Sequence, residues 1–433
     1  MADKALLSHL FRRAGFGARP HELTYYAERD YAVAVDDLVG ARPLAGESSN
    51  AASGTSSPWT DGTSTGPSST LASIQQTWVQ RMLTTTTPLV ERMTLFLHNQ
   101  IATSYRGDNN PGANDLLVQN DLFRSHALGS WSALVHALLT DVAVGLYLDV
   151  DSNRAGSINE NFARELMERF TLGPGNYTEA DVRNGARGLS GFRLVSAVDP
   201  TKPSRQLRLD GARHDNGNKT FLGHTGNLGP SDVADIILSQ PAATTFLATK
   251  LVQAFVQPDV PSGLVAPVAD GLRSSGWDLS GALRTIFLSP EFGAAASRRA
   301  IVKSPAEFAV GALRALAGTD PAWALGSMSS AGQDLFLPPN VGGWPPNQGW
   351  LASDMLLGRY NSAVSLGWLL SEGKLKSPVS GLSIDAWSTA LGMTELSDPV
   401  RSALENYLST SRPEGRLPGL VTLLVASPDY ALA

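Results

Sequence analysis

His98 is the residue whose type and setting point most directly to chemistry. Its segment, 88–103, is apolar on nearly every side, which predicts a buried helix. Glu91, Thr94 and His98 nevertheless fall on one narrow face at helical spacing. Because an unpaired buried polar group costs on the order of 1–3 kcal/mol, these side chains need partners. His98 is therefore a candidate metal ligand or general base, or else a core histidine that hydrogen-bonds to the backbone.

A pair of carboxylates forms the second candidate, in the helical segment 159–172. Glu165 and Glu168 are i,i+3 neighbours that project together, on the same face as Asn161 and Arg164. Facing a histidine from another helix, the two carboxylates could hold a divalent metal or do acid–base work. Arg164 would then stabilise developing negative charge, and Asn161 would contact the ligand. The alternative is a solvated charged face in which Arg164 neutralises a glutamate.

The dipeptide His214-Asp215 is the third candidate, and it precedes a glycine-rich turn. Together with His98, Glu165 and Glu168 it would complete a set of imidazole and carboxylate ligands that suits Zn, Fe or Mn. The compact H-E-x-x-H pattern is absent, so such a site depends on distant segments meeting. The alternative is an ordinary polar pair in a loop.

The loop 337–350 is the fourth candidate, because it places Trp344 and Trp350 among several prolines. Proline fixes φ and keeps a loop ordered at low entropic cost. The two indole rings could form a platform that binds a sugar, a peptide or a partner protein. The alternative is a packed loop that covers the end of the helices.

Composition and missing motifs exclude several classes of protein. The 433 residues include no Cys, which excludes disulfides, thiolate metal sites and a cysteine nucleophile. The formal net charge of -6 disfavours a surface for nucleic acid. The chain lacks the P-loop, the dinucleotide-binding glycine motif and the G-x-S-x-G elbow, so a nucleotide-driven motor and an α/β hydrolase are disfavoured.

Targeting signals are also missing from this chain. No stretch of 18 uninterrupted apolar residues is present, so we expect no membrane span. The first residues lack the apolar region of a secretory signal, which predicts a cytoplasmic location.

The elements that must position these residues are mostly helices. Apolar residues recur at helical period along most of the chain, and the convincing strands are two short ones within 192–222. The segment 42–70 is rich in Ser, Gly and Thr, which predicts a flexible excursion. The expected fold is therefore all-α: one large helical domain over 1–433, with a small β-hairpin insertion at 192–222.

The segment 159–173, NENFARELMERFTLG, resembles the bacterial family called domain of unknown function 1800. Further segments that resemble the family's motifs follow its order, namely LLSHLFRRAGFG at 6–17, FLHNQIA at 96–102, the segment 177–192, HD with KTFLG at 214–223, KSPAEF at 303–308 and the segment 333–351. Leu97 and Gln100 depart from the family's tryptophan-His-Asn-His-phenylalanine motif. The resemblance implies relatives that are often exported and encoded beside a sulfatase-like companion, and no established activity.

Two hypotheses of function follow. The first is an enzyme, with hydrolysis as the reaction class, whose pocket gathers His98, Glu165, Glu168, His214 and Asp215, around a divalent metal such as Zn, Mn or Fe. Glu165 or His98 would act as its base. The second is a non-catalytic binding or assembly protein, in which these residues form a buried polar network. A protein partner would then contact the tryptophan loop or the excursion at 42–70.

Overall fold

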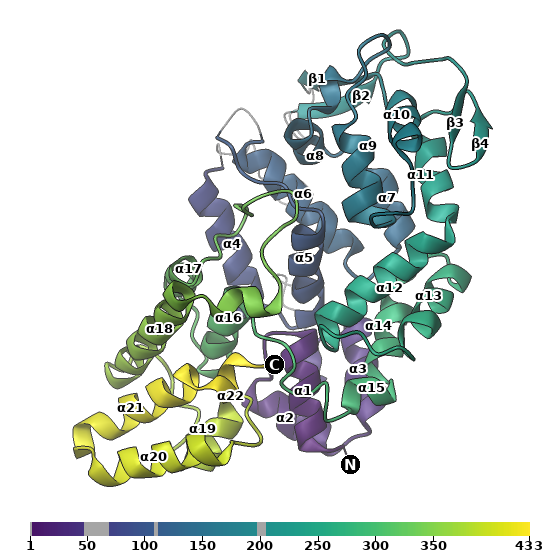
Figure 1. Ribbon diagram of the computed structural model, residues 1–433. Coiled ribbons are helices and arrows are strands. Elements are labelled where there is room, and N and C mark those ends of the chain that lie inside the picture. The colour runs from purple at the N-terminus through teal and green to yellow at the C-terminus, as the bar shows by residue number, and fades with distance from the viewer. Residues whose placement is uncertain (1, 47–68, 108–110, 197–204) are drawn as a thin grey trace.

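The computed structural model describes residues 2–46, 69–107, 111–196 and 205–433. Helices dominate it, and the strands of the described residues form two separate antiparallel pairs (Figure 1). This confirms the predicted all-α class with a small hairpin. None of the described helices is both long enough and apolar enough to span a bilayer.

The helices up to residue 188 begin and end largely where local sequence dictates. Asp3 caps the first of them by accepting a hydrogen bond from the Ala5 amide, and Thr178 and Asp181 form the capping box of the last. The bounds are α1 (Lys4–Ala14), α2 (Pro20–Ala27), α3 (Tyr31–Val39), α4 (Leu71–Thr84), α5 (Pro88–Gln100), α6 (Ala113–His126), α7 (Trp131–Leu138), α8 (Val142–Tyr147), α9 (Asn161–Glu165) and α10 (Glu179–Gly188).

The helices of the second half often start with proline in the first turn, where its missing N–H is harmless. Their bounds are α11 (Pro230–Ser239), α12 (Pro241–Phe255), α13 (Val265–Ser274), α14 (Leu279–Phe287), α15 (Pro290–Gly293), α16 (Pro305–Ala315), α17 (Pro321–Ser330), α18 (Ser353–Ser371), α19 (Ile384–Ala390), α20 (Asp398–Thr410), α21 (Pro413–Ala426) and α22 (Pro428–Ala431).

The expected hairpin within 192–222 is confirmed. Strand β1 (Phe192–Ser196) pairs antiparallel with β2 (Arg205–Leu209), and Phe192 lies opposite Leu209. A second, shorter hairpin of β3 (Lys219–Phe221) and β4 (His224–Gly226) was not expected. Strands of this length are too short for an alternation of polar and apolar residues to be recognised.

The segment 159–172 is not the single α-helix that its spacing predicts. Helix α9 passes into a π-helix at Leu166–Thr171. The amide of Leu172 bonds to the carbonyl of Met167 at 2.8 Å, five residues earlier, and the Thr171 hydroxyl donates to the carbonyl of Leu166 at 2.5 Å. The widened turns re-aim the side chains that follow, a feature frequently found at functional sites.

Two hydrophobic cores meet at α5. Leu89, Met93 and Leu97 of this helix belong to one core, which is built mainly from α1–α3, α7 and α9–α14. Leu95 belongs to the other, which joins α4 to α16–α21. In Figure 1, α5 accordingly stands in the middle of the molecule, with α4 on one side and α12 on the other.

Helix α1 is fastened to segments far along the chain. The Ser8 hydroxyl donates to the carbonyl of Gly392 at 2.6 Å, and the Arg13 guanidinium donates to the carbonyl of Ser297 at 2.5 Å. Leu7, Leu10 and Phe11 are fully buried beside them. The N-terminal helix is thus an inner element of the fold.

The expected excursion at 42–70 falls mostly outside the described residues, which omit 47–68. Its described beginning contains a short 3-10 turn at Leu44–Gly46, and the Leu44 side chain is buried. Its described end leads into α4, where the Thr70 hydroxyl accepts a hydrogen bond from the Ser73 amide.

Candidate functional site

A cleft lies between α5, α12 and the loop that connects α17 to α18. Its inner part is a cavity of about 260 Å³. Aromatic rings, amides and one ion pair line this cavity, and its members include Arg92, Phe96, Asn99, Gln253, Glu307, Gln333, Trp344 and Trp350. The ion pair joins Arg92 Nη2 to Glu307 Oε1 at 2.9 Å.

The outer part of the cleft is a second cavity of about 510 Å³. The two cavities share Phe96, Asn99, Gln253 and Trp344. The outer one adds charged and polar side chains from the π-helix, α5 and α12, namely Gln100, Glu168, Arg169 and Lys250. The cleft therefore leads from a polar mouth to a largely apolar interior.

Trp344 and Trp350, expected to bind a ligand, both line the inner cavity, and each is only 4% exposed. The Asn99 side-chain oxygen accepts a hydrogen bond from the Trp344 amide at 2.7 Å. Gly343 has a φ of +79°, and a Cβ there would collide with Asn99. Asn99 and Gly343 together hold the loop against α5 and fix the position of the Trp344 ring.

His98 is enclosed by aromatic rings. The ring centroids of Trp78, Phe336 and Trp344 lie 5.4, 5.3 and 5.4 Å from that of His98. Burial lowers the pKa of His98 to about 3, so the imidazole is neutral at physiological pH. Its buried Nε2 has no hydrogen-bond partner among the described residues. His98 lines neither cavity, whereas Glu168 lines the outer one, so the cleft does not bring the two residues together.

The two other polar residues predicted beside His98 are paired, and the Thr94 hydroxyl donates to the Val90 carbonyl at 2.8 Å. Glu91 accepts hydrogen bonds from Arg124 Nε at 2.6 Å and from the Trp78 indole at 3.0 Å. The polar face of α5 is therefore in part a buried structural network.

Glu165 and Glu168 lie together, as their spacing predicts. Both approach Arg169, whose Nε is 3.9 Å from Glu165 Oε2 and 3.7 Å from Glu168 Oε1. Glu168 also accepts a hydrogen bond from the Tyr177 hydroxyl at 3.0 Å. Burial raises the pKa of Glu165, and the neighbouring Glu168 adds to this rise while Arg169 opposes it.

Arg164 makes its close contacts with other carboxylates, although its charge also lowers the pKa of Glu165. Its guanidinium makes a two-point pair with Glu179, at 2.7 and 2.8 Å, and lies 3.4 Å from Glu160. Asn161 is exposed at the start of α9 and lines neither cavity. The expected roles of Arg164 in charge stabilisation and of Asn161 in ligand contact gain no geometric support.

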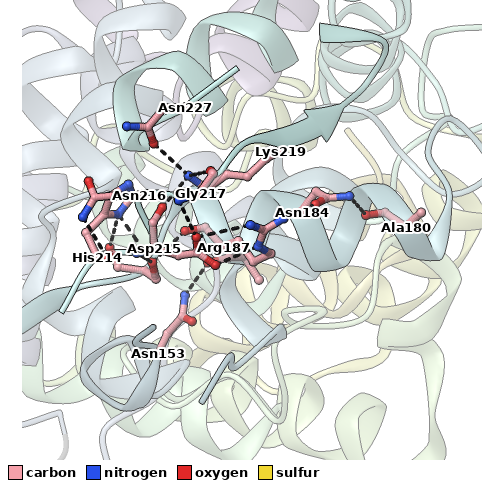
Figure 2. Close-up of polar contacts among 12 residues, drawn as sticks. Asn153, Ala180, Asn184, Arg187, His214, Asp215, Asn216, Gly217, Lys219 and Asn227 are labelled. Atoms are coloured by element: carbon pink, nitrogen blue, oxygen red, sulfur yellow. Dashed lines mark hydrogen bonds and ion pairs between the residues drawn. The ribbon is translucent and has the colours of Figure 1, made fainter. Parts of the chain in front are cut away.

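His214 and Asp215 are part of a separate network near the hairpins (Figure 2). Asp215 takes a two-point pair from Arg187, at 2.7 and 3.2 Å, which lowers the pKa of the carboxyl. The buried Lys219 ammonium donates to the carbonyls of Asp215 and Gly217 at 2.5 and 3.0 Å. His214 Nδ1 lies 2.9 Å from the Ser190 carbonyl. These contacts hold the turn between the two hairpins in shape.

The five expected metal ligands are consequently divided among three places. They are the aromatic enclosure of His98, the π-helix carrying Glu165 and Glu168, and the hairpin network of His214 and Asp215. Within the described ranges, no group of three or more His, Asp or Glu side chains is arranged to hold a metal ion. Glu165 and Glu168 lie together as their spacing predicts, and His214 and Asp215 belong to one network, but these two pairs and His98 do not meet.

A comparison with protein-family models decides the family. The model described as "Protein of unknown function (DUF1800)" matches residues 9–432, nearly the whole chain. The chain belongs to the DUF1800 family. No curated protein and no solved structure matches it.

Segments that carry the DUF1800 resemblance converge on the cleft. Phe96 and Asn99 come from the segment 96–102, Glu307 comes from 303–308, and Gln333 and Trp344 come from 333–351. The cleft thus joins segments that lie far apart in the chain.

Arg92 and Glu307 line the inner cavity although neither was among the predicted site residues. Glu307 is recognisable from sequence as the carboxylate of a capping box with Ser304, since the Ser304 amide donates to it at 2.8 Å. Its pairing with Arg92 joins segments more than 200 residues apart, which no local pattern reveals.

Proposed function

We propose that this DUF1800 protein binds a small organic molecule in the cleft between α5, α12 and the tryptophan loop. The observation that carries the proposal is the lining of the inner cavity, where aromatic rings surround a few amide groups. Ligand sites are typically concave and apolar, with a small number of polar groups that orient the ligand. A cavity of about 150 Å³ already accepts benzene, and the inner cavity here has about 260 Å³.

The position of Trp344 supports the same proposal. One side of the ring packs on His98, and the residue also lines both cavities. Asn99 and Gly343 hold it there without help from a ligand. A binding surface that is ordered in advance loses less entropy when the ligand arrives.

Gln253→Trp is expected to abolish binding of small aromatic compounds. Gln253 is exposed and lines both cavities, so a bulky ring at this position fills their junction and leaves Trp344 and the core intact. The measurement is an NMR titration with phenylethanol, phenylacetamide and phenylacetate.

The matched control is Gln76→Trp, which makes the same change at an exposed position of α4 that lines neither cavity. The control should bind like the unaltered protein. The proposal is wrong if none of the compounds binds, or if Gln253→Trp binds them as well as the control does.

A second candidate function is acid–base hydrolysis at the mouth of the cleft. The observation that favours it is the pair on the π-helix, where Glu165 has a raised pKa and Glu168 lines the outer cavity. A carboxyl group whose pKa is raised by burial is suited to donate a proton, and a second carboxyl group beside it is suited to accept one.

Glu168→Gln is expected to reduce the turnover of chromogenic p-nitrophenyl esters by about 100-fold or more, the usual contribution of a general base. The control is Glu179→Gln, an exposed carboxylate that pairs with Arg164 and lines neither cavity. Equal turnover by both variants, or none by the unaltered protein, would contradict this candidate.

A further inference from the structure

The wall of the inner cavity is backed by a cluster of buried cations. Arg13, Arg92, Lys303 and Arg359 are between 1% and 8% exposed, and we call them the cation cluster. They come from α1, α5, the segment before α16, and α18. All four lie close enough to the Glu307 carboxylate to interact with it electrostatically.

Glu307 is itself buried and ionised. Burial opposes its charge, yet Arg92 and hydrogen bonds from Ser304 lower the pKa of this carboxyl below its ordinary value. Three buried guanidinium groups, together with the Lys303 amine whose pKa is lowered well below its ordinary value, therefore share one carboxylate. The balance of charge in this part of the interior is positive.

Several donors of the cation cluster are unused. In the described part of the chain, no hydrogen-bond partner exists for the buried Nε and Nη1 of Arg13, Nε of Arg92, or Nε and Nη1 of Arg359. Arg13 gives a single hydrogen bond, to the Ser297 carbonyl, and Arg359 gives a single one, to the Lys303 carbonyl. Buried guanidinium groups are ordinarily satisfied by several acceptors.

Burial and the nearby positive charges lower the pKa values of two members of the cation cluster. Burial and the neighbouring Arg12 lower the pKa of Arg13 to about 9. Burial, again with a contribution from Arg12, lowers the pKa of Lys303 well below its ordinary value. An excess of buried positive charge is unfavourable unless an anion compensates it.

The inner cavity gives an anion access to this charge. Arg92 and Glu307 line it, and so do Ser304 and Gln333, while the remaining wall is largely apolar. Low-dielectric walls concentrate the field of charges placed at the end of a cavity. A ligand with an apolar body and a charged end matches both parts of the lining.

We propose that the occupant of the cleft is a small organic carboxylate. Its carboxylate lies at the Arg92 end of the inner cavity and offsets the charge of the cation cluster, and its apolar body lies between Phe96, Trp344 and Trp350. The inference rests on the proposed binding function and adds the chemical class of the ligand. A carboxylate fits better than a free phosphate, because the largely apolar remainder of the wall matches an organic body that a free phosphate lacks.

The test compares three probes on the unaltered protein at pH 7 by calorimetry and NMR. They are phenylacetate, its neutral isostere phenylacetamide, and inorganic phosphate. Phenylacetate is expected to bind at least about tenfold more tightly than phenylacetamide, because a charge-assisted hydrogen bond is roughly twice as strong as a neutral one. Phosphate is expected not to displace it.

Two variants test whether Arg92 causes the preference for phenylacetate over phenylacetamide. Arg92→Met should remove the preference for the acid over the amide, whereas Arg92→Lys, which keeps the charge, should retain most of it. Thermal unfolding and the amide's own affinity show whether each variant is folded. The comparison on the unaltered protein stands even if Arg92→Met does not fold.

The outcomes separate the two proposals. Equal affinity for the acid and the amide would overturn the carboxylate inference and leave the binding function intact. Displacement of phenylacetate by phosphate would also overturn it, since it assigns the site to a phosphate. Failure of every aromatic probe to bind would overturn the binding function itself.

Discussion

Glu307→Ala is expected to lower the free energy of unfolding by about 3–5 kcal/mol, the usual cost of removing one partner from a buried ion pair. The Glu307 carboxylate is 6% exposed and lies 2.9 Å from Arg92. Without it, Arg92 and the other members of the cation cluster lose the carboxylate they share. The capping hydrogen bond to the Ser304 amide is lost as well.

Urea unfolding at pH 7 measures this effect, and two further variants interpret it. Glu307→Gln keeps the shape and a capping oxygen, so it isolates the loss of charge and should account for most of the destabilisation. Asp385→Ala removes a 73% exposed carboxylate that pairs with Arg401, and exposed pairs contribute only about 0–1 kcal/mol. A loss at Glu307 no larger than at Asp385 would show that the cations are compensated in another way.

The second large effect is a loss of folding stability at low pH. His9 and His98 are both buried, and burial is the first cause that lowers their pKa values, to about 2 and about 3. For His9, the nearby Arg13 and Arg12 lower the pKa further. In the unfolded chain both imidazoles recover a pKa of about 6.5, so between pH 6.5 and pH 3 the unfolded state binds more protons than the folded state.

Stability is therefore fully present above pH 6.5 and falls as the pH decreases towards 3. Each histidine contributes a slope of up to about 1.4 kcal/mol per pH unit in this interval. We expect His98→Gln to lose that much of the slope when urea unfolding is compared between pH 6 and pH 4. Carboxylates that titrate nearby affect both proteins equally and cancel in the comparison.

His9→Gln provides an independent check, because His9 contacts Phe292 and is not part of the aromatic enclosure of His98. The His9→Gln variant should lose a similar part of the slope of unfolding free energy against pH. The double variant should lose about twice as much of it. If the slope is unchanged in His98→Gln, the imidazole is not held in its neutral form in the folded protein.

Local patterns in the sequence predicted the fold well. The predicted hairpin of β1 and β2 depends on residues close together in the chain, and it is found in the structure. The capping box of Thr178 and Asp181 and the positive φ of Gly173 are local features of the same kind. The π-helix was not predictable, because its extra residue per turn is a property of backbone bonding and Leu166–Thr171 carries no distinctive residue types.

The candidate site was predicted less completely. The spacing of Glu165 and Glu168 correctly placed them together, but Arg169 rather than Arg164 approaches them. Charged residues in a sequence are normally assigned to the surface, which is why the cation cluster was missed. One signal was available: Arg13 follows Leu10 by three residues, so it lies on the apolar side of α1.

The attachment of α1 to Gly392 and Ser297 has a consequence for the order in which the protein can fold during synthesis. The Ser8 side chain bonds to a carbonyl 384 residues further along the chain. At a translation rate of about 5–20 residues per second, that partner is made roughly 20–80 s after Ser8. Until then the Ser8 hydroxyl lacks the acceptor that it has in the folded protein, and Arg13 of the same helix lacks the Ser297 carbonyl until that residue is made. These two attachments of α1 therefore form late, after the contacts that it makes with α2, α3 and α5.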